Sequence, residues 1–193
     1  TRIRWAREVA AVIDIPLLVG GGIATLADMG ALFEVGVSAV SVNSAAVARP
    51  GLIKEAAEHY GSHRVVIAID GRRNDTLPSG YEVVVNGGRV PTGLDLGTWA
   101  REVERRGAGE ILLTSMDADG TQAGFDLRML QAVTATVSIP VIASGGAGSL
   151  AHFYDALTVG GAEAALAASL FHYNTLTIGQ VKAYLRQRGV AVR

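Results

Sequence analysis

Short apolar runs alternate with amphipathic segments along most of the chain, and this pattern predicts an α/β protein built on a parallel sheet. The runs lack a clean alternation of polar and apolar positions, as expected for strands that are buried on both faces. The segments between them carry apolar residues at helical spacing. Strands are predicted at residues 17–19, 40–42, 65–69, 111–114, 141–143 and 164–168, and helices at residues 26–35, 51–60, 96–106, 127–135, 150–159 and 178–188.

Two segments depart from this alternation. The chain opens on residues 3–13, whose apolar positions predict an amphipathic helix with no strand before it. Asn86-Gly87 lies between the segments at 81–85 and 89–90, and this dipeptide predicts a tight hairpin.

The number and length of the strand–helix units favour a barrel. Six units in 193 residues take about 32 residues each, so eight units would need about 260, close to the ~250 residues of a (β/α)₈ TIM barrel. The predicted fold is therefore an α/β (β/α)₈ TIM barrel that is incomplete, with strands 3–8 present. Residues 1–193 would form a single domain that lacks the first strand, the first helix and the second strand. An open doubly wound sheet is the alternative.

One pattern occurs twice in the chain. An apolar strand leads into glycines at residues 15–22 and again at residues 139–146, an offset of 124 residues. In each copy a helix follows, and then a second strand that ends in small residues, at Asn43-Ser44 and at Ala168-Ser169. The offset is about half of a barrel of ~250 residues, which also favours the barrel over the doubly wound sheet.

Glycine-rich turns at strand ends are suited to phosphate. Glycine allows positive φ and a close approach of the backbone to a ligand, and free backbone N–H groups in such turns bind phosphate. Two copies predict two phosphate sites, or one ligand with a phosphate at each end. The alternative is that the glycines only relieve crowding, but the matching of the two copies favours phosphate.

Composition narrows the class of protein. The chain is 49% hydrophobic and has a formal net charge of −1, which is typical of a globular protein and argues against nucleic acid as the main partner. It contains no cysteine, which excludes disulfides and thiolate metal sites within it. Neither a signal peptide nor an apolar run long enough to span a membrane is visible, so we expect a cytoplasmic protein.

The predicted carboxyl ends of the strands carry carboxylates and hydroxyls, but neither histidine nor cysteine. Because barrel enzymes build their active sites at these ends, we expect acid–base catalysis by carboxylates, with no metal and no cofactor. Asp70 is the strongest candidate, since it ends an unbroken apolar strand, where burial raises the pKa of a carboxyl group. The alternative is an aspartate that caps the next turn. Thr114 and Ser144 end two further strands and are candidate substrate-binding residues.

Other polar residues lie in the segments that follow these strands. Asp119, with Gly120 and Thr121 after it, predicts a turn that helps to hold a phosphate. Asp117 is either structural or a second acid. His152 and His172 fall near the starts of helices and are interpreted as structural.

Five segments closely resemble the cyclase subunit of imidazole glycerol phosphate synthase, an enzyme of histidine biosynthesis. They are VVIAID at 65–70, RGAGEILLTS at 106–115, DADGT at 117–121, IASGGAG at 142–148 and AALAAS at 164–169. The resemblance extends over essentially the whole chain. The sister isomerase of the same pathway shares both phosphate patterns and is one alternative, and a non-catalytic phosphate-binding fragment is another.

The resemblance implies a barrel that binds a ribulosyl aminoimidazole carboxamide nucleotide with a phosphate at each end. Ammonia would come from a glutaminase subunit, forming a heterodimer on the amino-terminal face of the barrel. The products would be imidazole glycerol phosphate and aminoimidazole carboxamide ribonucleotide. Asp70 matches one of the family's two catalytic aspartates. The phosphate-binding residues implied are Gly22, Asn43 and Ser44 at one site, and Asp119, Gly120, Gly146, Ala168 and Ser169 at the other.

The sequence departs from the family's pattern in two places. The other catalytic aspartate belongs to the first strand, which is absent here together with the flexible loop that follows it, so we expect the chain alone to be inactive. At the amino-terminal face, Glu110 matches one residue of a charged ring around the ammonia entrance. Ala39, however, stands where a lysine is usual, and Ser38 where an acidic residue is usual. The gate and the partner contact are therefore expected to differ.

Overall fold

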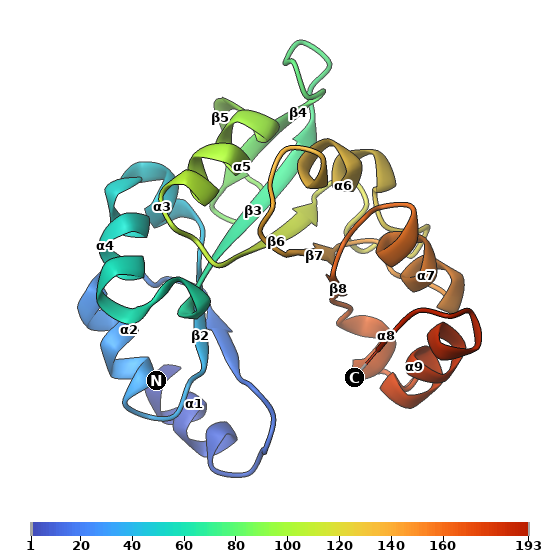
Figure 1. Cartoon of the computed structure of the whole chain (residues 1–193), viewed down its shortest axis with the longest axis horizontal. Helices are drawn as coiled ribbons and strands as arrows, with labels where there is room; N and C mark the ends of the chain where they lie inside the picture. Colours follow the sequence, from blue (N-terminus) through green and yellow to red (C-terminus); the bar gives the residue numbers. More distant parts are fainter. Residues whose placement is uncertain (1, 193) are drawn as a thin grey trace.

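The computed structural model describes residues 2–192, which form an eight-stranded, mostly parallel sheet. Six parallel strands follow one another in the order β1-β2-β3-β6-β7-β8, and β4 and β5 form an antiparallel hairpin beside β3. The sheet curves, so that β1 and β8 lie on opposite sides of an opening (Figure 1). The strands are β1 (Leu18–Gly20), β2 (Ala39–Val42), β3 (Val65–Arg73), β4 (Tyr81–Val85), β5 (Val90–Asp95), β6 (Glu110–Ser115), β7 (Val141–Ser144) and β8 (Ala164–Ala165).

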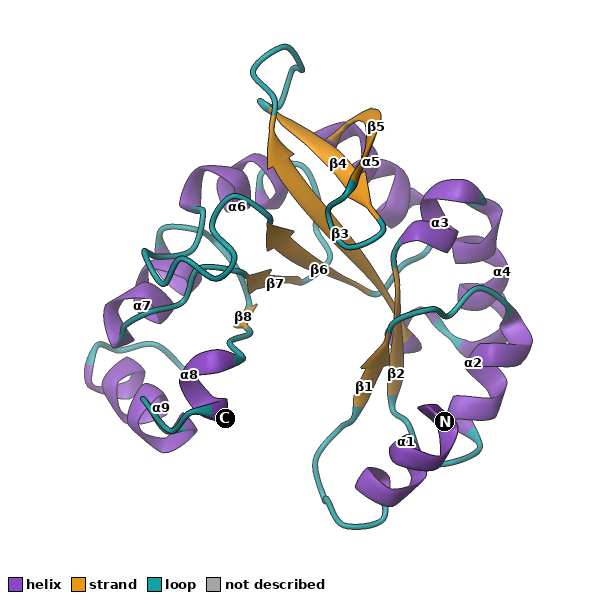
Figure 2. Cartoon of the chain, turned by 180° about the vertical axis from the view of Figure 1, so that it is seen from behind, coloured by secondary structure: helices purple, strands orange, loops and turns teal. Residues whose placement is uncertain are grey.

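Helices cover the outer side of the curved sheet, which makes the molecule an open half-barrel (Figure 2). The arrangement confirms the predicted α/β fold and the incomplete barrel, and it excludes a doubly wound sheet, which carries helices on both faces. Among residues 2–192, no helix has both the length and the apolar character needed to cross a membrane. The helices are α1 (Arg2–Ala10), α2 (Leu26–Phe33), α3 (Ser44–Ala48), α4 (Gly51–Tyr60), the 3₁₀ turn η1 (Ser62–Arg64), α5 (Leu96–Arg105), α6 (Leu127–Thr134), α7 (Leu150–Thr158), α8 (Ser169–His172) and α9 (Ile178–Gln187).

Successive residues of the central strands alternate between the helices and the inner side of the half-barrel. In β6 the odd-numbered residues are buried and the even-numbered ones are half-buried. The strands pair in register, so Ile67, Ile111 and Val141 form one row across β3, β6 and β7, and none is more than 2% exposed. This apolar layer fixes the strands against the helices and aligns their carboxyl ends along one edge of the sheet.

The structure corrects two predicted strands. β3 was predicted to end at Asp70, but it continues to Arg73, because β4 pairs antiparallel with its last four residues. β8 was predicted over residues 164–168, but it is regular only at Ala164–Ala165. Only β7 pairs with β8 among residues 2–192, so one side of this strand has no ladder to extend it. The short helices α3 and α8, which are the next elements after β2 and β8, were not predicted.

Both ends of the sheet expose apolar surface. Trp5 of α1, next to β1, is 70% exposed, and Ile178 of α9, on the side of β8, is 56% exposed. A hollow of about 390 Å³ lies between α1 and β1, and one of about 870 Å³ is lined partly by β8 and α9. Unpaired strand edges and exposed apolar patches of this kind favour association with further polypeptide.

Candidate functional site

Asp70, Thr114 and Ser144 lie side by side at the carboxyl edge of the sheet. The register pairs Asp70 of β3 with Thr114 of β6, and Thr114 with Ser144 of β7. All three residues are half-buried, in positions that alternate with the buried residues facing the helices. The sequence predicted each of them as a strand-end residue, and the structure brings them into one row on the inner side of the half-barrel.

The carboxyl group of Asp70 is held by a neighbouring amide. Asn43, which directly follows β2, donates from Nδ2 to Oδ2 of Asp70 over 3.0 Å. Burial raises the pKa of Asp70, the Asn43 hydrogen bond acts in the opposite direction, and the negative charge of Asp119 raises it further. The net shift is upward, as the sequence predicted, which brings Asp70 closer to the range in which a carboxyl group can both accept and give up a proton.

Asp70→Asn is expected to raise the free energy of unfolding at pH 7. The fold holds the pKa of Asp70 above its ordinary value, so between the two pKa values the folded state binds more protons than the unfolded state. Stability therefore falls as pH rises through that interval, and asparagine removes this loss. Urea unfolding should show the gain at pH 7 and little of it at pH 3, where the carboxyl group is mostly protonated in both states.

The exposed carboxylate of Asp14 supplies the control for this measurement. Asp14→Asn should change stability much less at either pH. If the gain from Asp70→Asn were equal at pH 7 and pH 3, its cause would be packing rather than ionisation, and the account of Asp70 given above would be wrong.

The first glycine pair lines a cavity of about 530 Å³, here called the first pocket. Gly21 and Gly22 follow β1 with φ of 92° and 64°, in the region that glycine adopts most readily. Asn43 and Ser44, at the end of β2, line the same cavity. The structure thus brings together the three residues predicted for this phosphate site, Gly22, Asn43 and Ser44.

The second glycine pair lines a cavity of about 230 Å³, here called the second pocket. Gly145 and Gly146 follow β7 with φ of 88° and 103°. The backbone at Gly146 is closely packed, because the Gly124 N–H donates to its carbonyl oxygen over 2.8 Å. The pocket contains every residue predicted for the other phosphate site together with Ser144, namely Asp119, Gly120, Ser144, Gly146, Ala168 and Ser169.

The two pockets flank Asp70. One lies at the ends of β1 and β2 and the other at the ends of β7 and β8, while β3 and β6 lie between them. The pockets are four strand spacings apart, about 19 Å along the curved sheet at about 4.8 Å for each spacing. Thr114 lies within this span, in the row that joins Asp70 to Ser144.

Contacts also indicate the roles of the remaining polar residues. Oδ2 of Asp117 accepts the Arg73 N–H over 2.7 Å, which favours the structural alternative for Asp117. The Thr121 N–H donates to the Ala118 carbonyl over 3.0 Å and closes the predicted turn around Asp119 and Gly120. Nδ1 of His152 accepts the Gly148 N–H over 3.0 Å, in keeping with a structural histidine. Within residues 2–192, no group of three or more histidine, aspartate and glutamate side chains is arranged to hold a metal ion.

Sequence reasoning missed one contribution to the first pocket. Asn86 and Gly87, the turn between β4 and β5, line it together with the strand ends. Arg2, which lines the hollow between α1 and β1, has its guanidinium group close to Gly22. The hairpin itself was predicted from Asn86-Gly87, but its position depends on the extension of β3, which no local pattern signals.

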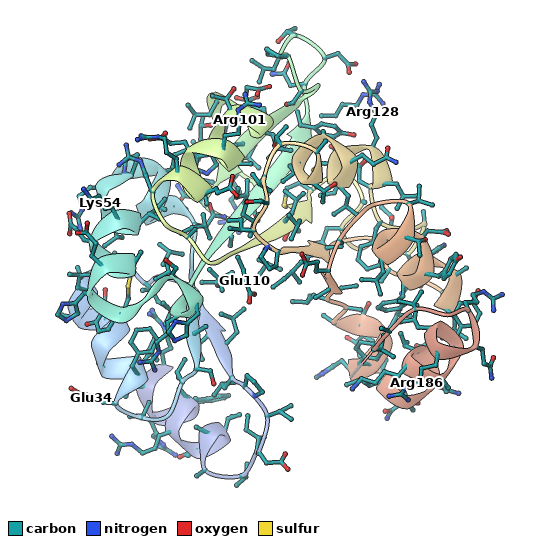
Figure 3. All side chains as sticks on the ribbon, in the orientation of Figure 1. Glu34, Lys54, Arg101, Glu110, Arg128 and Arg186 are labelled. Carbon is teal, nitrogen blue, oxygen red and sulfur yellow. The ribbon has the colours of Figure 1, made fainter. Side chains whose placement is uncertain are left out.

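At the opposite, amino-terminal end of the strands, Glu110 is the first residue of β6. Its side chain points into the opening of the half-barrel, whereas the labelled charged residues on the helices, such as Lys54 and Arg101, lie on the outer side (Figure 3). Ala39 begins β2 at the same end. Ser38 precedes it, and its Oγ accepts the Leu17 N–H over 3.0 Å, so this serine joins β1 to β2.

Comparisons with known proteins show which family this chain resembles. Residues 1–177 match the model of a protein family described as "Histidine biosynthesis protein". The chain is 54% identical over 182 residues to "Imidazole glycerol phosphate synthase subunit HisF" of Nostoc sp., and 56% identical over 182 residues to the protein of the same name from Trichormus variabilis. The matched part is 94% of this chain in both cases, and 70% and 71% of the two relatives. Both relatives are named as a subunit of imidazole glycerol phosphate synthase, and neither is named as the sister isomerase.

Proposed function

The chain belongs to the histidine biosynthesis protein family, and from this premise we propose what its site does. It is a lyase of the cyclase type found in imidazole glycerol phosphate synthase. In the proposed reaction, ammonia and a ribulosyl aminoimidazole carboxamide nucleotide give imidazole glycerol phosphate and aminoimidazole carboxamide ribonucleotide, and the carbonyl oxygen that ammonia displaces leaves as water. The observation that carries the proposal is the position of Asp70 between two matched glycine pockets.

The two pockets would hold the two phosphates of one substrate. Each supplies consecutive glycines at positive φ, whose backbone approaches a ligand without hindrance from a side chain. Backbone N–H groups in such turns favour anions. A ligand anchored at both ends would lie across β3 and β6, so its reacting centre would come next to Asp70 and Thr114. Binding of the two phosphates, which do not themselves react, would therefore hold the reacting centre in a fixed orientation.

Asp70 would act as a general acid and base on the bound nucleotide. Its partly buried carboxyl group has a raised pKa, which favours proton exchange. The Asn43 amide fixes the orientation of that carboxyl group, and Thr114, the next residue in the row, offers a hydroxyl to the substrate. The chemistry in this proposal uses side chains and ammonia, without a cofactor.

Ammonia would arrive from the amino-terminal end of the strands. The names of the relatives describe a subunit, so their enzyme contains further chains. We propose a glutaminase subunit as the partner in a heterodimer, on the face that carries Glu110, Ala39 and Ser38. Ammonia would travel along β6 from Glu110 to Thr114, a distance of about 13 Å at ~3.3 Å for each residue. The proposed location is the cytoplasm.

Inorganic phosphate or sulfate is expected to occupy both pockets in a crystal soaked in either ion. The physical reason is that each pocket presents backbone donors on a turn with two left-handed glycines. The measurement is the electron density next to Gly22 and next to Gly146, at two ion concentrations. A well-ordered crystal in which both pockets stay empty at high concentration would count against the bisphosphate proposal.

A further inference from the structure

The turn that joins β4 to β5, residues 86–88, forms part of the wall of the first pocket. β3 continues beyond the last residue of β2, and β4 then takes the place of β2 beside it, with Val84 opposite Asp70. The chain turns back immediately afterwards, at Asn86 and Gly87, and both residues line the pocket. The hairpin therefore contributes to a site that strand ends alone were expected to form.

Ser44 is the point at which this turn meets the phosphate-binding residues. The Asn86 N–H donates to Oγ of Ser44 over 3.1 Å. A serine hydroxyl has one hydrogen and two lone pairs, so a hydroxyl that accepts a bond on one side directs its own hydrogen to another. Phosphate oxygens are acceptors. The contact thus leaves the Ser44 hydroxyl as a donor for a phosphate in the pocket that Ser44 lines.

Arg72 holds the turn from the other side. Its guanidinium group donates to the carbonyl oxygen of Gly88, and a hydrogen bond with a charged donor is stronger than a neutral one. The turn needs such support because three successive residues have positive φ, namely 55° at Asn86, 67° at Gly87 and 77° at Gly88. For Asn86 this is an uncommon conformation. A chain of contacts therefore runs from Arg72 through the turn to Ser44.

We propose that Arg72 and Asn86 are positioning residues for phosphate binding in the first pocket. Arg72 fixes the turn, the backbone amide of Asn86 fixes the Ser44 hydroxyl, and that hydroxyl donates to the phosphate. Arg72 itself does not touch the ligand. The inference rests on the proposed function, since it requires a phosphate in the first pocket.

Titration of the 193-residue chain with inorganic phosphate, followed by amide NMR, tests the proposal pocket by pocket. The Gly22 amide reports on the first pocket and the Gly146 amide on the second. Arg72→Met is expected to weaken binding in the first pocket about tenfold, the size of one lost hydrogen bond to a charged group, and to leave the second unchanged. The matched control is Arg89→Met, which removes the same charge from an exposed residue beside the same turn, and which should change either affinity by less than about twofold.

A double-mutant cycle shows whether Arg72 acts through Ser44. Ser44→Ala should weaken phosphate binding by a similar factor, and the double variant with Arg72→Met should bind no more weakly than Ser44→Ala alone. Additive losses would overturn the proposal, because they would mean that Arg72 contacts phosphate directly. Equal losses from Arg72→Met and Arg89→Met would overturn it in favour of long-range attraction. If the unaltered chain shows no shift at Gly22, the proposed phosphate site fails, and this inference fails with it.

Discussion

Asp70→Asn is expected to lower the rate of ammonia-dependent cyclisation by roughly 10²–10⁴-fold, the usual contribution of one proton-transfer group. The measurement requires a closed barrel, because the family resemblance assigns the second catalytic aspartate to a strand outside residues 1–193. A separate polypeptide carrying the strand–helix–strand segment of a relative can supply it. The open edges of β1 and β8, and the apolar hollows beside them, are the surfaces to which that segment would bind.

Residues 1–193 alone should give no measurable turnover, and addition of the segment should restore formation of imidazole glycerol phosphate from substrate and ammonium salt. Product identity separates this reaction from the isomerase reaction. Asp75→Asn is the control, since Asp75 is an exposed carboxylate that forms an ion pair with Arg73, the last residue of β3. Full activity of the chain without the segment would contradict the two-aspartate mechanism, and full activity of Asp70→Asn in the restored barrel would exclude Asp70 as the proton-transfer group.

Most of the fold could be predicted from the sequence because the secondary structure that each segment favours is also the one that the packed fold requires. The central strands are apolar runs, although only one face of each is fully buried, and the helices between them have strong periodicity, as in α5 and α6. The glycine pairs were informative for a physical reason. Gly21, Gly22, Gly145 and Gly146 all have positive φ, so the residue type reports directly on the backbone that the turn requires.

The parts that were missed depend on neighbours that are distant in sequence. β3 passes Asp70 only because β4 folds back to pair with it, and the same pairing carries Asn86 to the first pocket. β8 stops after two residues because one of its sides is unpaired among residues 2–192. The residues of an apolar run show its tendency to form a strand, but they do not show whether a partner strand lies beside it.

Within the site, Asn43 also makes a contact that could not be predicted, because its partner is distant in sequence. The family pattern assigned it to a phosphate, and it does line the first pocket. The structure adds that its amide donates to Asp70, which is 27 residues away in sequence. The contact joins one phosphate site to the candidate acid–base group, and it arises only because β2 and β3 are adjacent and in register.

Gly146→Ala is expected to lower the free energy of unfolding by roughly 2–4 kcal/mol and to weaken phosphate binding in the second pocket at least about tenfold. Two effects act together at this position. The residue has φ of 103°, which alanine adopts with strain. A Cβ here would also overlap the carbonyl oxygen of Gly124, which is backbone and cannot rotate away as a side chain can. The loop after β7 would have to separate from the segment after β6, and both segments line the second pocket.

Gly189→Ala is the matched control, because Gly189 has φ of 78° but nothing within 4 Å of an added Cβ. It isolates the cost of the left-handed conformation, about 1–3 kcal/mol, from the cost of backbone overlap. Urea unfolding gives the two stabilities, and the Gly22 and Gly120 amides, one in each pocket, give the two phosphate affinities. Gly146→Ala should affect the second pocket and spare the first. If it were no more damaging than Gly189→Ala and left binding at the second pocket intact, close backbone packing at Gly146 would not be what shapes that pocket.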